Sequence, residues 1–185
     1  MKKTRALLLC VAAPLLLQGC GIATTKYESS YDNVQLLRQQ APLQVVDTPQ
    51  VKANPGLDRL SIRTNPLSTP SGRDLTLHVK DALEGELKQA GLLQADARRK
   101  LDVLIVENKL DAAMGTGHGV LAATFTLSEE QKSLYQSTKR VESNWESSFV
   151  GAVAIPRAAN AFNPLVQKLL AELYADPAFI QALRK

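Results

Sequence analysis

A long alternation of apolar and polar residues in the second half of this 185-residue chain most constrains how it can fold. Over residues 133–149 the odd positions include large apolar side chains, namely Tyr135, Val141, Trp145 and Phe149. The even positions are mostly polar or charged. A period of two is typical of a strand with one buried face and one solvated face. This run therefore predicts a long strand of an antiparallel sheet.

Further strands are predicted on the N-terminal side of this run. Residues 101–106 are rich in aliphatic and β-branched side chains and predict a buried strand. Residues 120–127 place an apolar side chain at every second position, and the polar residues 128–132 predict the turn of a hairpin. The glycine-rich residues 115–119 predict a loop. Two shorter strands are expected, at residues 43–47 and 60–62.

Apolar residues spaced three and four apart predict two main helices. The first covers residues 75–90, with Ser71 as its expected N-cap and Gly91 as its C-cap. The second covers residues 163–174, and a shorter helix over residues 177–183 follows it. Together these elements predict an α+β fold. We expect a two-layer sandwich in which an antiparallel sheet of about four strands carries the two main helices on one face.

The N-terminus has the pattern of a secretory signal peptide over residues 1–19. Lys2, Lys3 and Arg5 precede an apolar run of about twelve residues, which is shorter than the roughly twenty that span a membrane. Removal of this segment takes away three cations and leaves 19 basic residues against 18 acidic ones. A nearly neutral mature chain gives no charge argument for nucleic-acid binding.

Residues 17–20, Leu-Gln-Gly-Cys, resemble the bacterial lipobox, although Gln18 departs from the usual small or apolar residue. The resemblance implies that Cys20 becomes the mature N-terminus and carries an S-diacylglycerol group and an N-acyl chain such as palmitate. It also implies that acylated Cys20 holds the protein on a membrane. Gly21, in place of the aspartate that retains enteric lipoproteins in the inner membrane, implies the outer membrane with the domain facing the periplasm.

The mature chain is expected to consist of a tether and one domain. Residues 20–40 are predicted to be the lipidated N-terminus and its tether, with a short helix over residues 31–40, and residues 41–185 a single periplasmic domain. Five prolines lie between residues 41 and 71, so we expect irregular structure packed on the domain there, with a flexible linker as the alternative. Because Cys10 leaves with the signal peptide, no disulfide is available and the core alone must stabilise the domain.

The sequence offers no convincing catalytic, metal or cofactor site. His78 is expected at the solvated edge of the first main helix, and His118 lies in the predicted glycine loop without a partner at a recognisable spacing. With no cysteine available and only two histidines, a zinc site is not expected. We therefore predict a protein that is not an enzyme and uses no cofactor.

Two kinds of surface are candidates for binding. Trp145 and Phe149, on one face of the predicted strand, form either part of the core or a partner or ligand surface. The small apolar residues 149–156 are expected to form a loop that lines a groove or covers one end of the sheet. The basic residues 98–100 and 139–140 are either solvated surface or contacts for anionic lipid headgroups or lipopolysaccharide phosphate.

The order of these features resembles a known group of envelope proteins. The lipobox, the mid-chain helix, the three-strand meander and a C-terminal helix pair containing residues 174–180 resemble YajG-type outer-membrane lipoproteins. The likeness covers about residues 70–185 and extends more distantly to LPS-assembly lipoproteins of the LptE type and to lipoprotein partners of envelope lipid transporters. It implies a non-enzymatic binding or assembly factor with an envelope protein or lipid as partner. A regulatory lipoprotein of the peptidoglycan synthesis machinery is the alternative.

Overall fold

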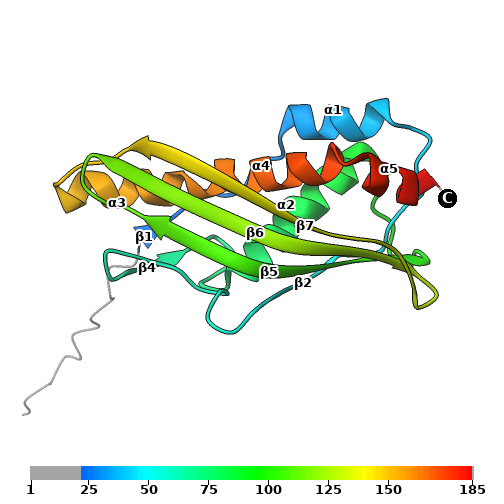
Figure 1. Cartoon of the computed structure of the whole chain (residues 1–185), viewed down its shortest axis with the longest axis horizontal. Helices are drawn as coiled ribbons and strands as arrows, with labels where there is room; N and C mark the ends of the chain where they lie inside the picture. Colours follow the sequence, from blue (N-terminus) through cyan, green and yellow to red (C-terminus); the bar gives the residue numbers. More distant parts are fainter. Residues whose placement is uncertain (1–21, 185) are drawn as a thin grey trace, which may run out of the picture.

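The computed structural model describes residues 22–184 and has the predicted α+β architecture (Figure 1). The elements, in chain order, are β1 (Ile22–Ala23), α1 (Tyr31–Gln39), β2 (Gln50–Ala53), β3 (Ser61–Ile62), β4 (Asn65–Ser68), α2 (Leu75–Ala90), β5 (Arg99–Asp111), β6 (Thr116–Glu129), β7 (Lys132–Glu146), α3 (Gly151–Asn160), α4 (Phe162–Tyr174) and α5 (Pro177–Arg184). The helices α2, α4 and α5 contact the main sheet, and α1 packs on α2 and α4 as an outer layer.

The main sheet has the strand order β2-β5-β6-β7. The meander β5-β6-β7 is antiparallel as predicted, but β2 joins β5 in parallel, with Val51 opposite Val103. The sheet is therefore mixed rather than wholly antiparallel, because α2 lies between β2 and β5 in the chain and supplies the crossover that parallel neighbours need. The strand predicted at residues 43–47 is reduced to an isolated bridge at Val46, and pairing resumes only after Pro49.

The strands of the meander are longer than their apolar patterns suggested. Glu130 and Gln131 form a two-residue hairpin turn in which both residues have positive φ, so β6 and β7 extend almost to each other. The loop predicted at residues 115–119 lies instead at residues 112–115, since β6 begins at Thr116 and Gly117 pairs with Trp145. The proline-rich segment is not a linker, because its strands β3 and β4 bury Ile62 and Leu67.

The structure differs from the prediction at the start of one helix and in the presence of another. The N-cap of α2 is Asp74 rather than Ser71, and its carboxylate accepts a hydrogen bond from the Thr76 amide at 2.9 Å. The segment expected to be a loop at residues 149–156 is largely helical, because α3 begins at Gly151 and includes Pro156. Its alanine content favours helix strongly enough to tolerate an exposed proline one turn after the start.

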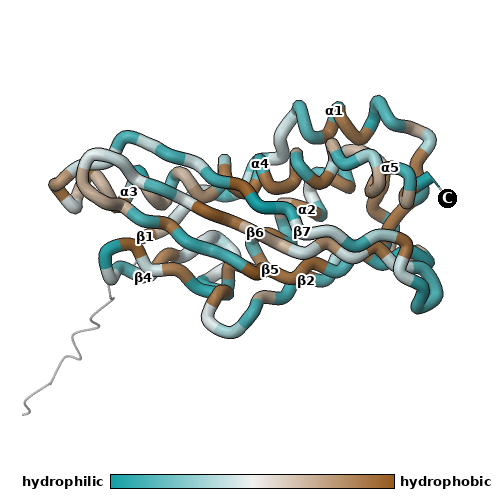
Figure 2. Tube along the Cα trace, in the orientation of Figure 1, coloured by the Kyte–Doolittle hydropathy of each residue, from teal (hydrophilic) through white to brown (hydrophobic). Residues whose placement is uncertain are grey.

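The core lies between the sheet and the helices. Figure 2 shows apolar residues along β6 and on the inner sides of the helices. The fully buried members of this layer come from α2, α4 and the meander and include Val79, Leu83, Leu87, Leu165, Leu169, Ile105, Leu121 and Phe125. On the opposite face the sheet carries polar pairs such as Thr124 with Thr138, whose hydroxyl oxygens are 2.8 Å apart.

Asp176 fastens the C-terminal helices to β7. Its carboxylate accepts hydrogen bonds from the Tyr135 hydroxyl at 2.8 Å, from Lys139 Nζ at 2.5 Å and from the Ala178 amide at 2.8 Å, which caps α5. Burial alone would raise the pKa of Asp176, but these three donors together outweigh it and lower the pKa to about 2. The ionised carboxylate therefore stabilises the junction of α4, α5 and β7.

The Asp176→Asn variant tests this junction. A pKa lowered from 3.8 to about 2 contributes about 2 kcal/mol of stability above pH 4, and that contribution is lost as the pH falls through the folded-state pKa. We expect the variant to be less stable by about this amount at pH 7 and nearly equal to the wild type near pH 2, as measured by urea denaturation. The exposed Asp111→Asn is the control, and a pH-independent difference would contradict the account.

Candidate functional site

A groove lies beside Trp145, between the end of β7 and the junction of α3 and α4. Its volume is about 340 Å³, and it is lined by Ser143, Trp145, Glu146, Arg157, Asn160, Ala161 and Pro164. Trp145 is half-buried and supplies the aromatic surface, while Arg157 and Asn160 supply polar groups. An aromatic wall with a few convergent polar groups is the usual composition of a ligand or partner site.

The groove exists because β6 carries glycines opposite Trp145. A Cβ atom on Gly117 would lie 2.2 Å from the indole Nε1 of Trp145, and one on Gly119 would lie 3.1 Å from the six-membered ring. The indole therefore rests directly on the backbone of β6, and its Nε1 is buried without a hydrogen-bond partner in residues 22–184. The glycines that suggested a loop instead make room within a strand for the tryptophan.

Phe149 does not share this site. It was expected on the same strand face as Trp145, but β7 ends at Glu146, so the alternation stops before residue 149. The Arg63 guanidinium donates to the Ser148 carbonyl at 2.8 Å and to the Phe149 carbonyl at 3.0 Å and holds the backbone in a turn. The Phe149 side chain is 77% exposed.

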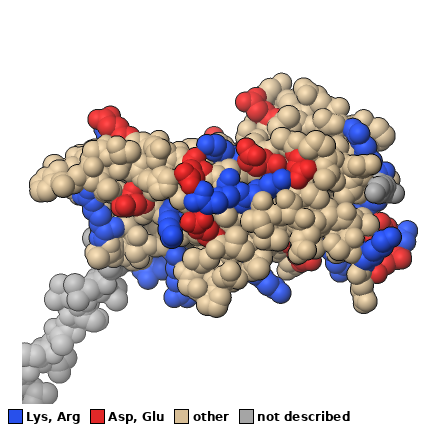
Figure 3. Space-filling view, in the orientation of Figure 1, with Lys and Arg blue, Asp and Glu red and all other residues tan. Residues whose placement is uncertain are grey.

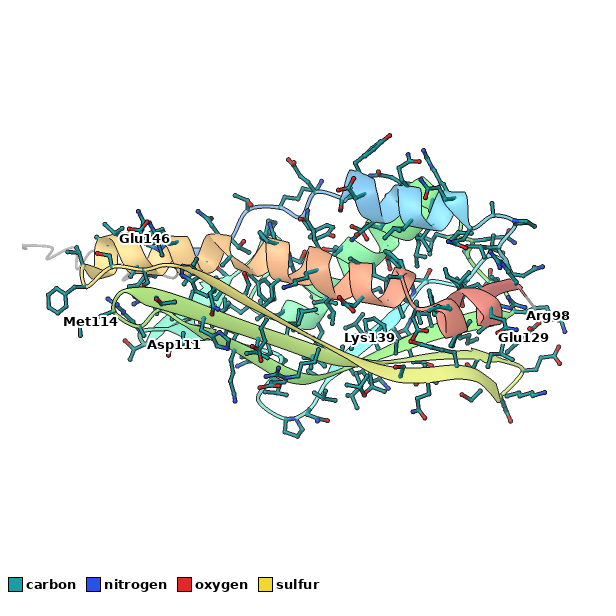
Figure 4. The ribbon with its side chains drawn as sticks, turned by 45° about the horizontal axis from the view of Figure 1, so that its top comes forward. Arg98, Asp111, Met114, Glu129, Lys139 and Glu146 are labelled. Carbon is teal, nitrogen blue, oxygen red and sulfur yellow. The ribbon has the colours of Figure 1, made fainter. Side chains whose placement is uncertain are left out.

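Phe149 belongs instead to an apolar tip that we define as Met114, Phe149, Val150 and Val153. Met114 is 69% exposed, Val150 55% and Val153 40%. Arg63 also donates to the Ala112 carbonyl at 2.9 and 2.6 Å, so one side chain fixes both segments that form the tip. Figure 4 places Met114 at one extreme of the molecule and Arg98 with Glu129 at the other.

A second feature is the fully buried carboxylate of Glu86 on α2. It accepts hydrogen bonds from the Tyr27 hydroxyl at 2.6 Å and from the Ser30 amide at 2.9 Å. Asn33 Nδ2 lies 3.2 Å from both carboxylate oxygens and also donates to the Gln167 carbonyl at 2.9 Å. Burial raises the pKa of Glu86 despite these donors, and burial followed by the nearby Glu86 carboxylate raises the pKa of Tyr27.

These contacts attach the N-terminal segment to the domain. Residues 22–40 were expected to be part of a tether, but Ile22–Ala23 pairs with β4 and residues 24–30 run along α2 and α4. Gly85 permits the close approach, because a Cβ atom there would lie 3.0 Å from Ser29 Oγ. Beside this segment an open cavity of about 780 Å³ is lined mainly by residues 26–29 and by His78 and Asp81 of α2.

Both histidines pair with asparagine amides. His78 is buried rather than solvated, because its Nε2 lies 2.7 Å from Asn163 Oδ1 and its ring packs against Phe162. Burial lowers the pKa of His78, so the ring is neutral at pH 7. His118 Nδ1 lies 2.7 Å from Asn144 Oδ1 on the open face of the sheet. Neither ring is hydrogen-bonded to a carboxylate among the described residues.

Four of the five residues in the basic clusters are paired within the molecule, and the fifth, Lys100, is exposed on β5. Arg99 is buried and donates to the Ala182 and Leu183 carbonyls at the end of α5, while Arg98 pairs with Glu129 and Glu130. Lys139 pairs with Asp176, and Arg140 pairs with Glu107 and Glu142. Figure 3 accordingly shows basic and acidic atoms interleaved across the middle of the molecule rather than a patch of one sign.

The predicted lipid attachment residue Cys20 lies outside the described residues. Within residues 22–184, no helix is long and apolar enough to cross a membrane. In the same part of the chain, no three His, Cys, Asp or Glu side chains are placed to hold a metal ion.

Glu86→Gln tests the attachment of the N-terminal segment. A glutamine amide would face the donors of Asn33 and Tyr27, leaving buried groups unpaired, so we expect a loss of about 3 kcal/mol of unfolding free energy. We also expect the amides of α1 to exchange with deuterium roughly tenfold faster than in the wild type. Glu172→Gln, on the exposed surface of α4, is the matched control. Unchanged exchange in α1 would show that Glu86 does not hold the segment.

The comparisons with known proteins identify the fold of this chain. No protein-family model and no curated protein matches this chain. Among solved structures it is similar to protein XCC0632 from Xanthomonas campestris, of family DUF330, with TM-score 0.57 and 16% identity over 75% of this chain and 85% of that one. Weaker likenesses are to the hypothetical protein CT253 from Chlamydia trachomatis (TM-score 0.46, 10% identity, 76% and 99% covered) and to a minor lipoprotein from Acinetobacter baumannii (TM-score 0.43, 9% identity, 74% and 91% covered). The chain therefore shares its α+β architecture with XCC0632.

Proposed function

We propose that this chain is a lipoprotein anchored through acylated Cys20 to the outer membrane, facing the periplasm, where it serves as a non-enzymatic binding or assembly factor of the cell envelope. The lipobox at residues 17–20 and the resemblance to YajG-type lipoproteins support the anchor. The observation that carries the proposal is the attachment of the chain immediately after Cys20. Ile22 already pairs with Leu67, and the Ile22 carbonyl accepts a hydrogen bond from Ser68 Oγ at 3.1 Å.

The Trp145 groove supports the binding role. Its aromatic wall, its polar rim of Arg157 and Asn160 and its rigid support on Gly117 suit recognition of an envelope protein or a lipid. Among the described residues, the side-chain hydrogen-bond partners of His78 and His118 are asparagines, and no hydroxyl or thiol nucleophile is paired with either ring. The proposal is accordingly that the partner is bound and released unchanged.

Substitutions at Cys20 and Gly21 test the lipid anchor and the membrane to which the protein is sorted. Cys20→Ala removes the acylated sulfur, so we expect the protein to lose the mass of its acyl groups and, when exported with a signal peptide whose cleavage does not depend on Cys20, to leave the membrane fraction, since stable anchoring requires two or more chains. In an enteric host, Gly21→Asp is expected to keep the acyl groups but move the protein to the inner-membrane fraction of a sucrose gradient. Membrane attachment of the Cys20→Ala variant would contradict the proposal.

Site-specific photo-crosslinking tests the groove. A photoreactive amino acid in place of Asn160, which is exposed and lines the groove, is expected to give a discrete protein or lipid adduct in living cells. The same amino acid in place of Glu172, exposed on the adjoining helix, is the control. Equal adducts at both positions, or none at Asn160, would contradict a binding role for this groove.

A further inference from the structure

The apolar tip lies at the same end of the molecule as the first described residues. α3, which carries Val153, contacts β1, and β1 pairs with β4 (Figure 1). Two peptide units join Cys20 to Ile22, and an extended chain of that length reaches only about 7 Å. Any membrane that holds the acyl chains of Cys20 is therefore brought close to this end of the domain.

We propose that the apolar tip is a membrane-contacting surface that enters the headgroup region of the bilayer holding the acylated Cys20. This inference rests on the proposed function, because it needs the lipid on Cys20. Met114, Phe149, Val150 and Val153 are exposed apolar side chains gathered at one end, an arrangement that is typical of a lipid or protein contact. The anchor favours lipid, because it holds the bilayer beside the tip.

The charge distribution around the tip agrees with a lipid surface. The ten residues between Glu146 and Arg157 include no charged side chain. Asp111 and Glu146, the acidic residues that end β5 and β7, lie back from Met114 along the strands (Figure 4). In Figure 3 the outermost part of the end that carries α3 is free of charged atoms, and basic and acidic atoms begin a short way behind it. Apolar side chains inserted to a depth of about 5–10 Å would leave the two carboxylates at the aqueous edge of the headgroups.

The tip is also built to keep its shape while it is exposed. Arg63 ties the backbone of both contributing segments, Ser148 Oγ accepts from the Val150 amide at 3.1 Å, and α3 begins at Gly151. A rigid apolar projection loses little conformational entropy on insertion. With the tip in the membrane, the strands β5 to β7 extend away from the bilayer. The fourteen residues of β6 span about 45 Å, so the end that carries Arg98 lies about that far from the bilayer.

A fluorescence measurement on the full lipidated chain tests the proposal. With Cys10 removed by processing and Cys20 in a thioether, Phe149→Cys supplies a single free thiol for an environment-sensitive nitrobenzoxadiazole label. In vesicles of phosphatidylethanolamine and phosphatidylglycerol, we expect its emission to shift to the blue and to be quenched severalfold by lipids that carry a doxyl group near the headgroup. Val150→Cys should behave alike, and Lys132→Cys, exposed in β7 beside the hairpin turn at the far end, should show neither effect.

The outcomes separate this inference from the proposed function. Absence of acyl mass on the purified chain, or failure of the vesicles to retain it, would overturn both. An acylated, vesicle-bound chain whose label at residue 149 behaves like the label at residue 132 would overturn the membrane contact alone. A blue shift without quenching by doxyl lipids would show that protein, such as a second copy of the chain, covers the tip, and would also overturn the inference.

Discussion

The buried carboxylate of Glu86 is the interaction on which the arrangement of this molecule depends. A charge-bearing group with no solvent contact is costly unless donors surround it, and three of its donors come from residues 27–33. The segment that follows the predicted lipid attachment site is thereby held against α2 and α4 instead of acting as a free tether. In the proposed lipoprotein, this attachment and the pairing of β1 with β4 would set the position of the domain relative to the membrane, because only Gly21 separates Cys20 from β1.

Much of the fold was predictable because it follows from periodicity. The alternation in β7 and the three-four spacing of α2 and α4 each require one buried face, and together they specify the α+β sandwich. The parallel placement of β2 was not predictable, since pairing between distant segments depends on the crossover through α2. The helix α3 was missed because proline and glycine at residues 151–156 suggest irregular structure, whereas the alanine-rich sequence and the sheet beneath it favour helix.

The candidate sites, like the fold, were only partly predictable from the sequence. Trp145 was identified as a candidate from its position on a strand. The groove beside it could not be predicted, because it depends on the pairing of Trp145 with Gly117 in the neighbouring strand. Phe149 was placed on the wrong surface because the end of β7 depends on the Arg63 contacts from residues far away in sequence. Glu86 had no signal at all, since a glutamate on an amphipathic helix is normally solvated. Its partners come from the segment that the sequence suggested was a tether.

In the proposed lipoprotein the domain stands directly on the membrane, with the α3 end facing the bilayer and residues 22–40 packed on the domain. Neutron reflectometry of the full lipidated chain on a supported bilayer measures this placement. The account predicts protein density that begins within the headgroup layer and extends outward by at least about 45 Å, the length of β6. A water layer between bilayer and protein, or a thin protein layer lying flat on the surface, would contradict it.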